Sequence, residues 1–362
     1  MSSRSFSLPF RLSVCMSLVC CWRVLWGGEM KAILAGPPQA GKTTLFEGLC
    51  AHTGGRFATA STHHILNITL SSDERLARLK EITARPNAVP ARFSLADPTP
   101  AASEGQKTAL MRQSDVLVFV LPLFAGADAQ KQRDEFINWR IEQDLAVVEG
   151  RLERVEAAMR KGGAAKKEAE KEHPVLVEVA QRLRNKQQLA DIISNPEKRR
   201  LLAHFGLLCA KPIVWVANTS EDEPSSGPQW AFSICAKLEK ELAEMEEAER
   251  AEFLAMFGLE RLHWDELIKH IYFGGGWGLF YTIGEEEVRA WEMSCGMTAR
   301  EAAAKIHSDF AKHFVKAEIV RYEDVVECGG WDAAVAAGKM RTVAADHPLR
   351  DGDVVFIKAA VR

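Results

Sequence analysis

The sequence lacks the cysteine patterns that mark zinc sites and disulfide frameworks. Three of its eight cysteines fall within the first thirty residues, and the other five are far apart and form no C-x-x-C pair. A chain without such pairs is expected in a reducing compartment, and we therefore predict a cytoplasmic protein.

A strong net charge and a long apolar run are also missing. The formal net charge of −3 predicts no general attraction to nucleic acid, so a polyanion would need a local basic patch. Residues 1–29 hold a short apolar stretch that Arg23 interrupts, which is too short for a membrane span, and no membrane partner is predicted. We expect the natural start at Met30 and treat residues 1–29 as a disordered or non-native extension.

From Met30 onward, apolar runs alternate with segments of helical periodicity, such as residues 42–52 and 73–84. The run over 115–121 is continuously apolar, as expected of a strand buried on both faces of a parallel sheet. The alternation predicts a doubly wound α/β domain of the nucleotide-binding kind over residues 30–128 and 201–278. Its predicted strands are 31–35, 65–70, 91–96, 115–121 and 212–218.

Residues 129–200 are rich in Glu, Lys, Arg, Ala and Leu, with apolar residues at helical spacing and a break at 162–167. This pattern predicts two long antiparallel helices, a coiled-coil hairpin inserted into the sheet domain. Its charges have two interpretations: a solvated face or a partner-binding arm.

Residues 237–258 have the periodicity of one long amphipathic helix. The glycine cluster at 274–278 lacks a following Lys-Ser/Thr, so we interpret it as a strand edge or linker. Residues 279–362 combine short strands with one helix over 299–314, which predicts a small α+β domain of the β-grasp type. We expect His307 to cap or pack on that helix and residues 351–353 to form a hairpin turn.

The stretch 36-GPPQAGKTT-44 has the spacing of a phosphate-binding loop between a strand and a helix. In such loops backbone N–H groups surround phosphate oxygens, the Lys contacts the outer phosphates, and the Thr hydroxyl binds Mg²⁺. We predict a nucleoside triphosphate site with Mg²⁺. The loop residues assigned to nucleotide binding are Gly36, Gln39, Ala40, Gly41, Lys42, Thr43 and Thr44.

Asp97 follows the predicted strand 91–96 and is the candidate to hold Mg²⁺ together with Thr43; the alternative is a turn-capping Asp. In switch-type GTPases this Asp begins Asp-x-x-Gly, and the glycine N–H contacts the third phosphate. The fourth residue here is Pro100, which has no N–H to donate.

A base-binding segment, 218-NTSE-221, follows the last predicted strand. Asn218 offers an amide to a purine, while Thr219 and Glu221 replace the Lys and Asp that read guanine in GTPases. Loss of the matched carboxylate removes guanine discrimination, so ATP becomes at least as plausible as GTP. The alternative is that Asn218 only turns the chain.

Together these motifs resemble the YchF / Obg-like ATPase family over nearly all of residues 30–362. The resemblance implies ATP binding with slow hydrolysis, a coiled-coil arm, a TGS-like C-terminal domain and association with the ribosome through its RNA or proteins. Lys42 and Thr43 match the family's phosphate and metal residues, and Asn218 and Glu221 match its base-reading pair. The segments that carry the resemblance are 36-GPPQAGKTTLF-46, 73-DERLARL-79, 211-KPIVWVANTSED-222, 287-EVRAW-291, 306-IHSDF-310, 338-GKMR-341 and 351-DGDVVFIK-358.

The departures from the family pattern fall mainly on groups that would support hydrolysis. Gln39 replaces an Asn associated with monovalent cations, 97-DPTPA-101 replaces D-I-A-G-L, and Phe119 stands at the position of the catalytic His. The catalytic residue is therefore unknown, with His63 or His64 as possible substitutes. Farther along the chain, 343-VAADH-347 replaces E-G-K-D-Y. Two hypotheses follow: a weak ATPase or GTPase whose state a ribosomal partner reads, or a degenerate nucleotide-binding scaffold.

Overall fold

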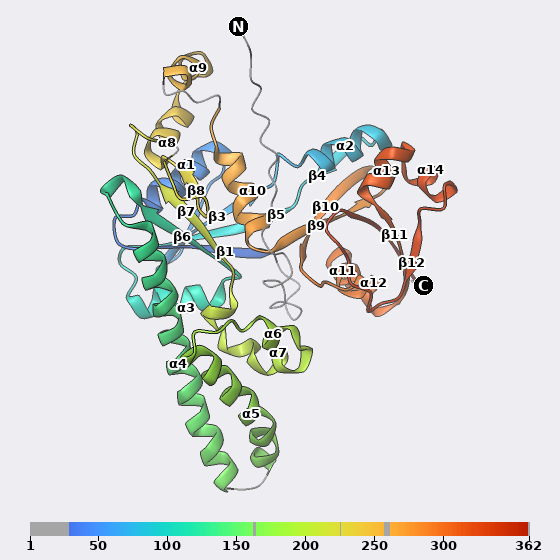
Figure 1. Cartoon of the computed structure of the whole chain (residues 1–362). Coiled ribbons are helices and arrows are strands. Elements are labelled where there is room, and N and C mark those ends of the chain that lie inside the picture. The colour runs from blue at the N-terminus through green and yellow to red at the C-terminus, as the bar shows by residue number, and fades with distance from the viewer. Residues whose placement is uncertain (1–28, 162–163, 225, 257–260, 361–362) are drawn as a thin grey trace.

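The computed structural model describes residues 29–161, 164–224, 226–256 and 261–360 (Figure 1). Of the extension expected over residues 1–29, all but Glu29 lies outside these ranges. Two β-sheets, one of seven strands and one of six, contribute to one continuous apolar core. Among the helices within these ranges, none is long and apolar enough to cross a membrane.

The seven-stranded sheet contains all five strands predicted for the nucleotide-binding domain. Strands β5, β1, β6, β7 and β8 are mutually parallel, whereas β3 runs antiparallel to β5, and β2 antiparallel to β3. The result is a mixed α/β sheet with a parallel centre. In spatial order the strands are β2 Ala58–Thr59, β3 His63–Thr69, β5 Arg92–Pro98, β1 Met30–Ala35, β6 Val116–Pro122, β7 Ile213–Asn218 and β8 Phe232–Ile234.

Helices cover both faces of this sheet, which explains the unbroken apolar run of β6. Its side chains alternate: Val116, Val118 and Val120 pack with α1 (Lys42–Thr53) and α10 (Trp264–Gly274). Leu117, Phe119 and Leu121 pack on the other face with α3 (Glu104–Gln113) and the first part of α4 (Ala129–Lys161).

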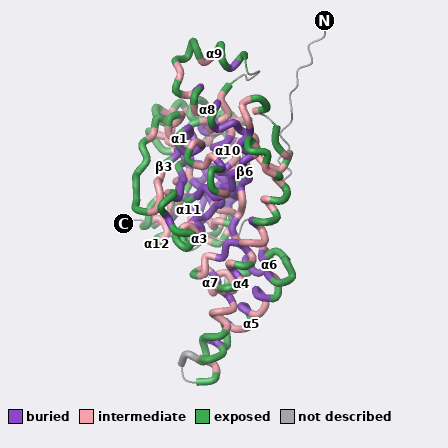
Figure 2. The backbone as a smooth tube through the Cα atoms, turned by 90° about the vertical axis from the view of Figure 1, so that its left-hand side faces the viewer, coloured by how far each residue is buried: buried purple, intermediate pink, exposed green. Residues whose placement is uncertain are grey.

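The predicted helical insertion is present as α4 and α5 (Ala164–Arg184), which lie side by side and extend away from the sheet (Figures 1 and 2). Their contact has its own apolar cluster, separate from the main core, and a bidentate pair between Arg151 and Glu172. The cluster extends past the predicted end at residue 200, because α6 (Ala190–Ser194), α7 (Pro196–Leu202) and Leu207 also pack into it.

Two segments predicted as single helices are each broken once. The segment 237–258 divides into α8 (Ala236–Glu244) and α9 (Glu247–Met256), because Met245 adopts an extended conformation. Residues 299–314 divide into α11 (Ala299–Ile306) and α12 (Ser308–Lys312) at His307, and β11 already begins at residue 314. The His307 side chain accepts from the Asp309 N–H and so starts the second helix. Its predicted capping role is confirmed, whereas the continuous helix is wrong.

The six-stranded sheet includes a strand from the N-terminal half of the chain, β4, which pairs with β10. The preceding helix α2 (Glu74–Thr83) packs nearby, and α13 (Tyr322–Cys328) and α14 (Trp331–Ala336) follow β11. The glycine cluster at 274–278 is the turn from α10 into β9. In spatial order the strands are β12 Arg341–Val343, β11 Phe314–Arg321, β13 Asp353–Ala359, β9 Trp277–Ile283, β10 Glu287–Ser294 and β4 Asn87–Val89.

The hairpin turn predicted at 351–353 is wrong. Strands β12 and β13 lie on opposite sides of β11, so the segment between them is no hairpin connection. Instead, the Asp351 carboxylate accepts from Arg75 Nη1 at 2.7 Å, from Arg75 Nη2 at 3.2 Å and from the Leu279 N–H at 2.8 Å. The Tyr281 hydroxyl adds a 2.9 Å bond to Asp73, the cap of α2. These contacts hold α2 against the second sheet.

We expect Asp351→Ala to lower the free energy of unfolding by about 2 kcal/mol, because it removes two charge-assisted bonds and leaves the Leu279 N–H without this partner. Glu81→Ala is the matched control, since it deletes an exposed partner of Arg78 on the same helix. It should cost less than about 0.5 kcal/mol. Urea denaturation measures both, and equal effects would contradict the role of this junction.

Candidate nucleotide-binding site

The loop between β1 and α1 needs glycine at two positions. Gly36 has φ 135° and Gly41 has φ 85°, both in the region that favours glycine. A Cβ at Gly36 would lie 2.6 Å from the Val120 carbonyl oxygen, and one at Gly41 would lie 2.1 Å from Asn218 Nδ2. The loop therefore packs tightly against the ends of β6 and β7.

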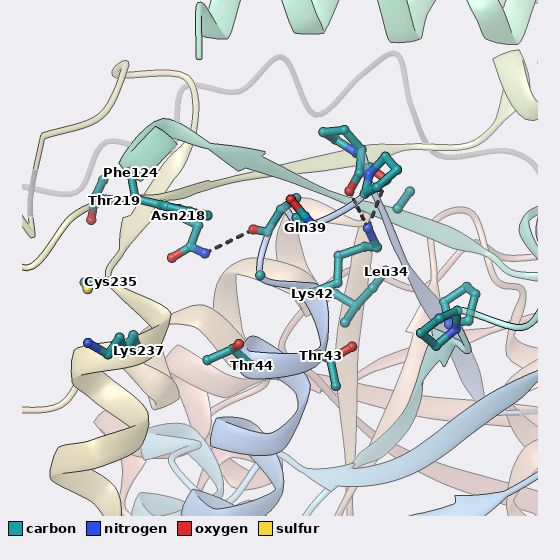
Figure 3. Close-up of a pocket in the computed structure, with 18 of the residues that line it drawn as sticks. Leu34, Gln39, Lys42, Thr43, Thr44, Phe124, Asn218, Thr219, Cys235 and Lys237 are labelled. Carbon is teal, nitrogen blue, oxygen red and sulfur yellow. Dashed lines mark hydrogen bonds between the residues drawn. The ribbon is translucent and has the colours of Figure 1, made fainter. Parts of the chain in front are cut away.

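Lys42 lies over this loop. Its Nζ donates to the carbonyl oxygens of Gly36, at 3.0 Å, and Pro37, at 2.6 Å (Figure 3). Burial lowers the pKa of Lys42, although the nearby Asp97 carboxylate opposes that shift. Gln39, at the turn of the loop, has φ 61°, a conformation that Gly and Asn adopt more readily than Gln.

Thr43 and Asp97 meet beneath the loop. The Thr43 hydroxyl donates to Asp97 Oδ2 at 2.9 Å, and Asp97 is only 1% exposed. Burial raises the pKa of Asp97, while the bond from Thr43 opposes the shift. Its other oxygen, Oδ1, is buried and has no hydrogen-bond partner among the described residues. A free carboxylate oxygen beside a hydroxyl fits Mg²⁺, which takes oxygen ligands.

A magnesium ion at this position would depend on phosphate oxygens and water for its remaining ligands. In the part of the chain that the structure describes, no group of three or more His, Cys, Asp or Glu side chains is arranged to hold a metal. Protein sites for Mg²⁺ commonly use one or two protein oxygens together with substrate phosphates, so Thr43 and Asp97 fit that arrangement.

A cavity of about 1040 Å³ opens over the loop, comparable in size to ligand pockets. It lies above the strand ends at which the loop and the segment after β7 meet. Asp97 itself lies below the lining and reaches the cavity through Thr43. The lining contains every residue that the sequence assigned to the nucleotide: Gly36, Gln39, Ala40, Gly41, Lys42, Thr43, Thr44, Asn218 and Glu221.

Asn218 joins three parts of this site. Its Nδ2 donates to the Ala40 carbonyl at 3.0 Å, and its Oδ1 accepts from the Ala236 N–H at 3.0 Å (Figure 3). The side chain is 5% exposed and therefore ties β7 to the loop and to the start of α8. An amide nitrogen carries two hydrogens, so Nδ2 can still donate to a ligand while it holds the loop.

The base-binding end contains residues that the sequence interpretation missed. Lys237 pairs with Glu221 at 2.7 Å, so the predicted base-reading carboxylate already has a cationic partner. Phe124, after β6, and Cys235, after β8, also line the cavity. The order of the strands could have predicted these lining residues. Parallel strands end at one edge of a sheet, so the residues that follow β6, β7 and β8 lie together at that edge.

Phe119, at the position of the family's catalytic His, and the two possible substitutes, His63 and His64, are absent from the cavity lining. Phe119 is 5% exposed and packs against Phe136 and Trp215, with ring centroids 4.3 and 5.2 Å away. His64, on β3, packs against Phe57, with ring centroids 5.1 Å apart. His63 Nδ1 lies 3.0 Å from the Thr62 hydroxyl oxygen. Neither histidine is among the lining residues.

A sheet with a parallel centre, whose first strand runs through Gly-x4-Gly-Lys-Thr into a helix, defines the class of P-loop NTPase folds. Comparison with known proteins is more specific. "Ribosome-binding ATPase YchF" from Bacillus subtilis (strain 168) is 30% identical over 364 residues, which cover 91% of this chain and 99% of that protein. The protein of the same name from Escherichia coli O157:H7 is 28% identical and covers 90% of this chain and 98% of its own length. The chain belongs to the YchF family.

A family model matches the C-terminal part of the chain, and two solved structures share its fold. The model YchF-GTPase_C, described as "Protein of unknown function (DUF933)", matches residues 278–360. The Schizosaccharomyces pombe YchF GTPase has a similar fold, with a TM-score of 0.69 and 22% identity over 93% of this chain and 100% of that chain. A GTP binding protein from Pyrococcus horikoshii OT3 has a TM-score of 0.54 and 17% identity, covering 91% of this chain and 100% of its own.

We expect Asn218→Ala to lower the free energy of unfolding by about 2 kcal/mol, because the buried Ala40 carbonyl and Ala236 N–H both lose this partner. Asn185→Ala, on an exposed residue, is the control and should stay within about 0.5 kcal/mol of the parent. Urea denaturation without nucleotide measures both variants. A loss no larger than that of the control would show that this amide does not hold the site together.

Asp97→Asn should raise the melting temperature at neutral pH in the absence of nucleotide and Mg²⁺. The pKa of Asp97 is raised in the folded protein, so the fold prefers the protonated carboxyl and loses stability as pH rises through that pKa. Asn is neutral at every pH and can still accept from Thr43. The gain should therefore shrink as pH falls toward the carboxyl's ordinary pKa of 3.8.

Scanning calorimetry of the parent and the variant between about pH 4 and pH 8 tests this sign. Asp346→Asn, which changes an exposed carboxylate, is the matched control and should show no such gain. Lower stability of Asp97→Asn at pH 7 would refute the prediction.

Proposed function

We propose that this protein binds ATP with Mg²⁺ and hydrolyses it slowly, and that a ribosomal partner reads its nucleotide state; GTP is the alternative nucleotide. The observation that carries the proposal is the assembly of Lys42, Thr43 and Asp97 around one glycine-containing loop. The names of the Bacillus subtilis and Escherichia coli relatives, ribosome-binding ATPases, support both the nucleotide and the partner. Such a partner places the protein in the cytoplasm.

Each end of the cavity has a distinct role in this proposal. The Lys42 ammonium neutralises the outer phosphates, and the N-terminus of α1 directs N–H groups and a partial positive charge at them. Thr43 and Asp97 hold Mg²⁺, which when bound neutralises phosphate charge. At the other end Asn218 donates to the base, and the exposed Phe124 ring offers it a flat apolar surface.

Slow turnover is proposed because the groups that usually orient the attacking water are missing from the cavity. No histidine occurs among the described residues that line it, and Phe119 packs into the core against Phe136 and Trp215. Removal of a water-orienting or charge-stabilising group typically lowers rates by factors of hundreds.

A second candidate function is a nucleotide-stabilised scaffold with negligible turnover. The rigid segment Asp97–Pro100 favours it, since Pro98 and Pro100 restrict the loop that moves on hydrolysis in switch proteins. In both candidates docking uses the α4–α5 arm and the C-terminal domain.

We further propose a domain division consistent with this function. Residues 30–128 and 201–278 form the nucleotide-binding domain, residues 129–200 the coiled-coil insertion, and residues 279–362 a TGS-like β-grasp domain. The order β10-β9-β13-β11-β12, with α11 between β10 and β11 in sequence, supports the β-grasp assignment. The separate apolar cluster of α4 and α5 supports the insertion.

A single-turnover assay with labelled ATP on a chain started at Met30 tests the enzyme proposal. We expect slow product formation that Lys42→Ala reduces by about a hundred-fold, because this variant removes the phosphate-binding cation. Turnover equal to that of Lys42→Ala would favour the scaffold. Equilibrium titration with ATP and GTP in Mg²⁺ tests binding itself, and cosedimentation with ribosomes tests the partner.

A further inference from the structure

The three residues after Asp97 that line the cavity, Pro98, Thr99 and Pro100, offer no free backbone N–H with which to contact a third phosphate. Pro98 and Pro100 carry no N–H, and the Thr99 N–H donates to the Thr62 carbonyl at 2.9 Å. All three residues line the cavity. A ligand beside Pro98–Pro100 therefore finds no available N–H donor on the backbone of these three residues.

Two side chains that line the cavity near Pro98–Pro100 can donate hydrogen bonds instead. Lys107 lies on α3, lines the cavity, and pairs with Glu104, one helical turn earlier, at 2.7 Å. The Glu104 side chain is 86% exposed, so this pair is weak and can exchange for a phosphate. The Thr99 hydroxyl, in the adjoining loop, is buried and has no hydrogen-bond partner in the described residues.

Lys107 lines the cavity together with Lys42 and with the loop Pro98–Pro100. Asn218 and Lys237 lie to one side of the loop and Lys42 to the other (Figure 3). The Lys107 charge acts on Lys42, whose pKa is lowered first by burial and further by this second cation. An added phosphate beyond Lys42 brings negative charge toward the Glu104 carboxylate, and the Lys107 ammonium would offset that charge in addition to Mg²⁺ held by Thr43 and Asp97.

We propose that Lys107 is the residue by which this site distinguishes a nucleoside triphosphate from a diphosphate, contacting the third phosphate in place of a backbone N–H. The inference rests on the proposed nucleotide-binding function and adds to it the residue that senses the third phosphate. A diphosphate needs only the loop 36–44 and Lys42, so Lys107 contributes to the triphosphate alone.

Titration calorimetry in Mg²⁺ with ADP and with the non-hydrolysable β,γ-imido analogue of ATP tests the proposal. Lys107→Gln should weaken the triphosphate analogue about ten-fold or more and change ADP affinity by less than about two-fold, as expected for loss of one charge-assisted contact. Lys107→Arg keeps the charge and should retain most of the triphosphate affinity. Lys80→Gln, which changes an exposed lysine of α2, is the matched control and should change neither affinity.

The outcomes separate this inference from the proposed function. A parent protein that binds neither nucleotide overturns both. A parent that binds both nucleotides, with Lys107→Gln losing triphosphate and diphosphate affinity equally or losing nothing, overturns the role of Lys107 alone. Selective loss of the triphosphate, with an unchanged melting temperature, supports it.

Discussion

The site depends on one buried side-chain amide, that of Asn218. It bonds to the Ala40 carbonyl and to the Ala236 N–H, and so joins the phosphate-binding loop, the end of β7 and the start of α8. Ala40 and Asn218 are 178 residues apart in the chain, and the whole α4–α5 arm lies between them. Gly41 approaches the same amide so closely that a Cβ would overlap it. The loop can keep its shape only while the strands beneath it keep theirs.

Local sequence patterns were sufficient to predict the nucleotide-binding half of the fold. The run 115–121 predicted a doubly covered strand, and β6 is buried on both faces. The loop motif predicted the lining residues that belong to the loop itself, because its spacing alone fixes their positions. The direction of β3 and the transfer of β4 to the second sheet were not predictable from local patterns. The first depends on pairing with β5, which follows α2 and β4 in the chain, and the second on pairing of Asn87–Val89 with the distant Glu287–Arg289.

Errors arose where one polar side chain changed the local outcome. His307 caps a second helix within a segment whose periodicity predicted one helix. Asp351 pairs with the distant Arg75, although the dipeptide Asp351-Gly352 had suggested a hairpin turn. Within the site, Lys237 and Lys107 escaped notice because neither belongs to a spaced motif. Only the fold brings them to the cavity, and Glu221 and Glu104 are the carboxylates they pair with.

The arrangement of cores indicates which parts of the molecule can move relative to one another. The two sheets share one apolar core, and the Arg75–Asp351 pair adds to their contact, so they form a single body. The α4–α5 arm has its own core and is held at its root by Arg112, which donates to the buried Asp144 at 2.8 Å and to the Gln143 carbonyl at 2.9 Å. Arg112 lies at the end of α3, the same helix that carries Lys107 at the cavity. One helix therefore contacts both the cavity, through Lys107, and the root of the arm, through Arg112.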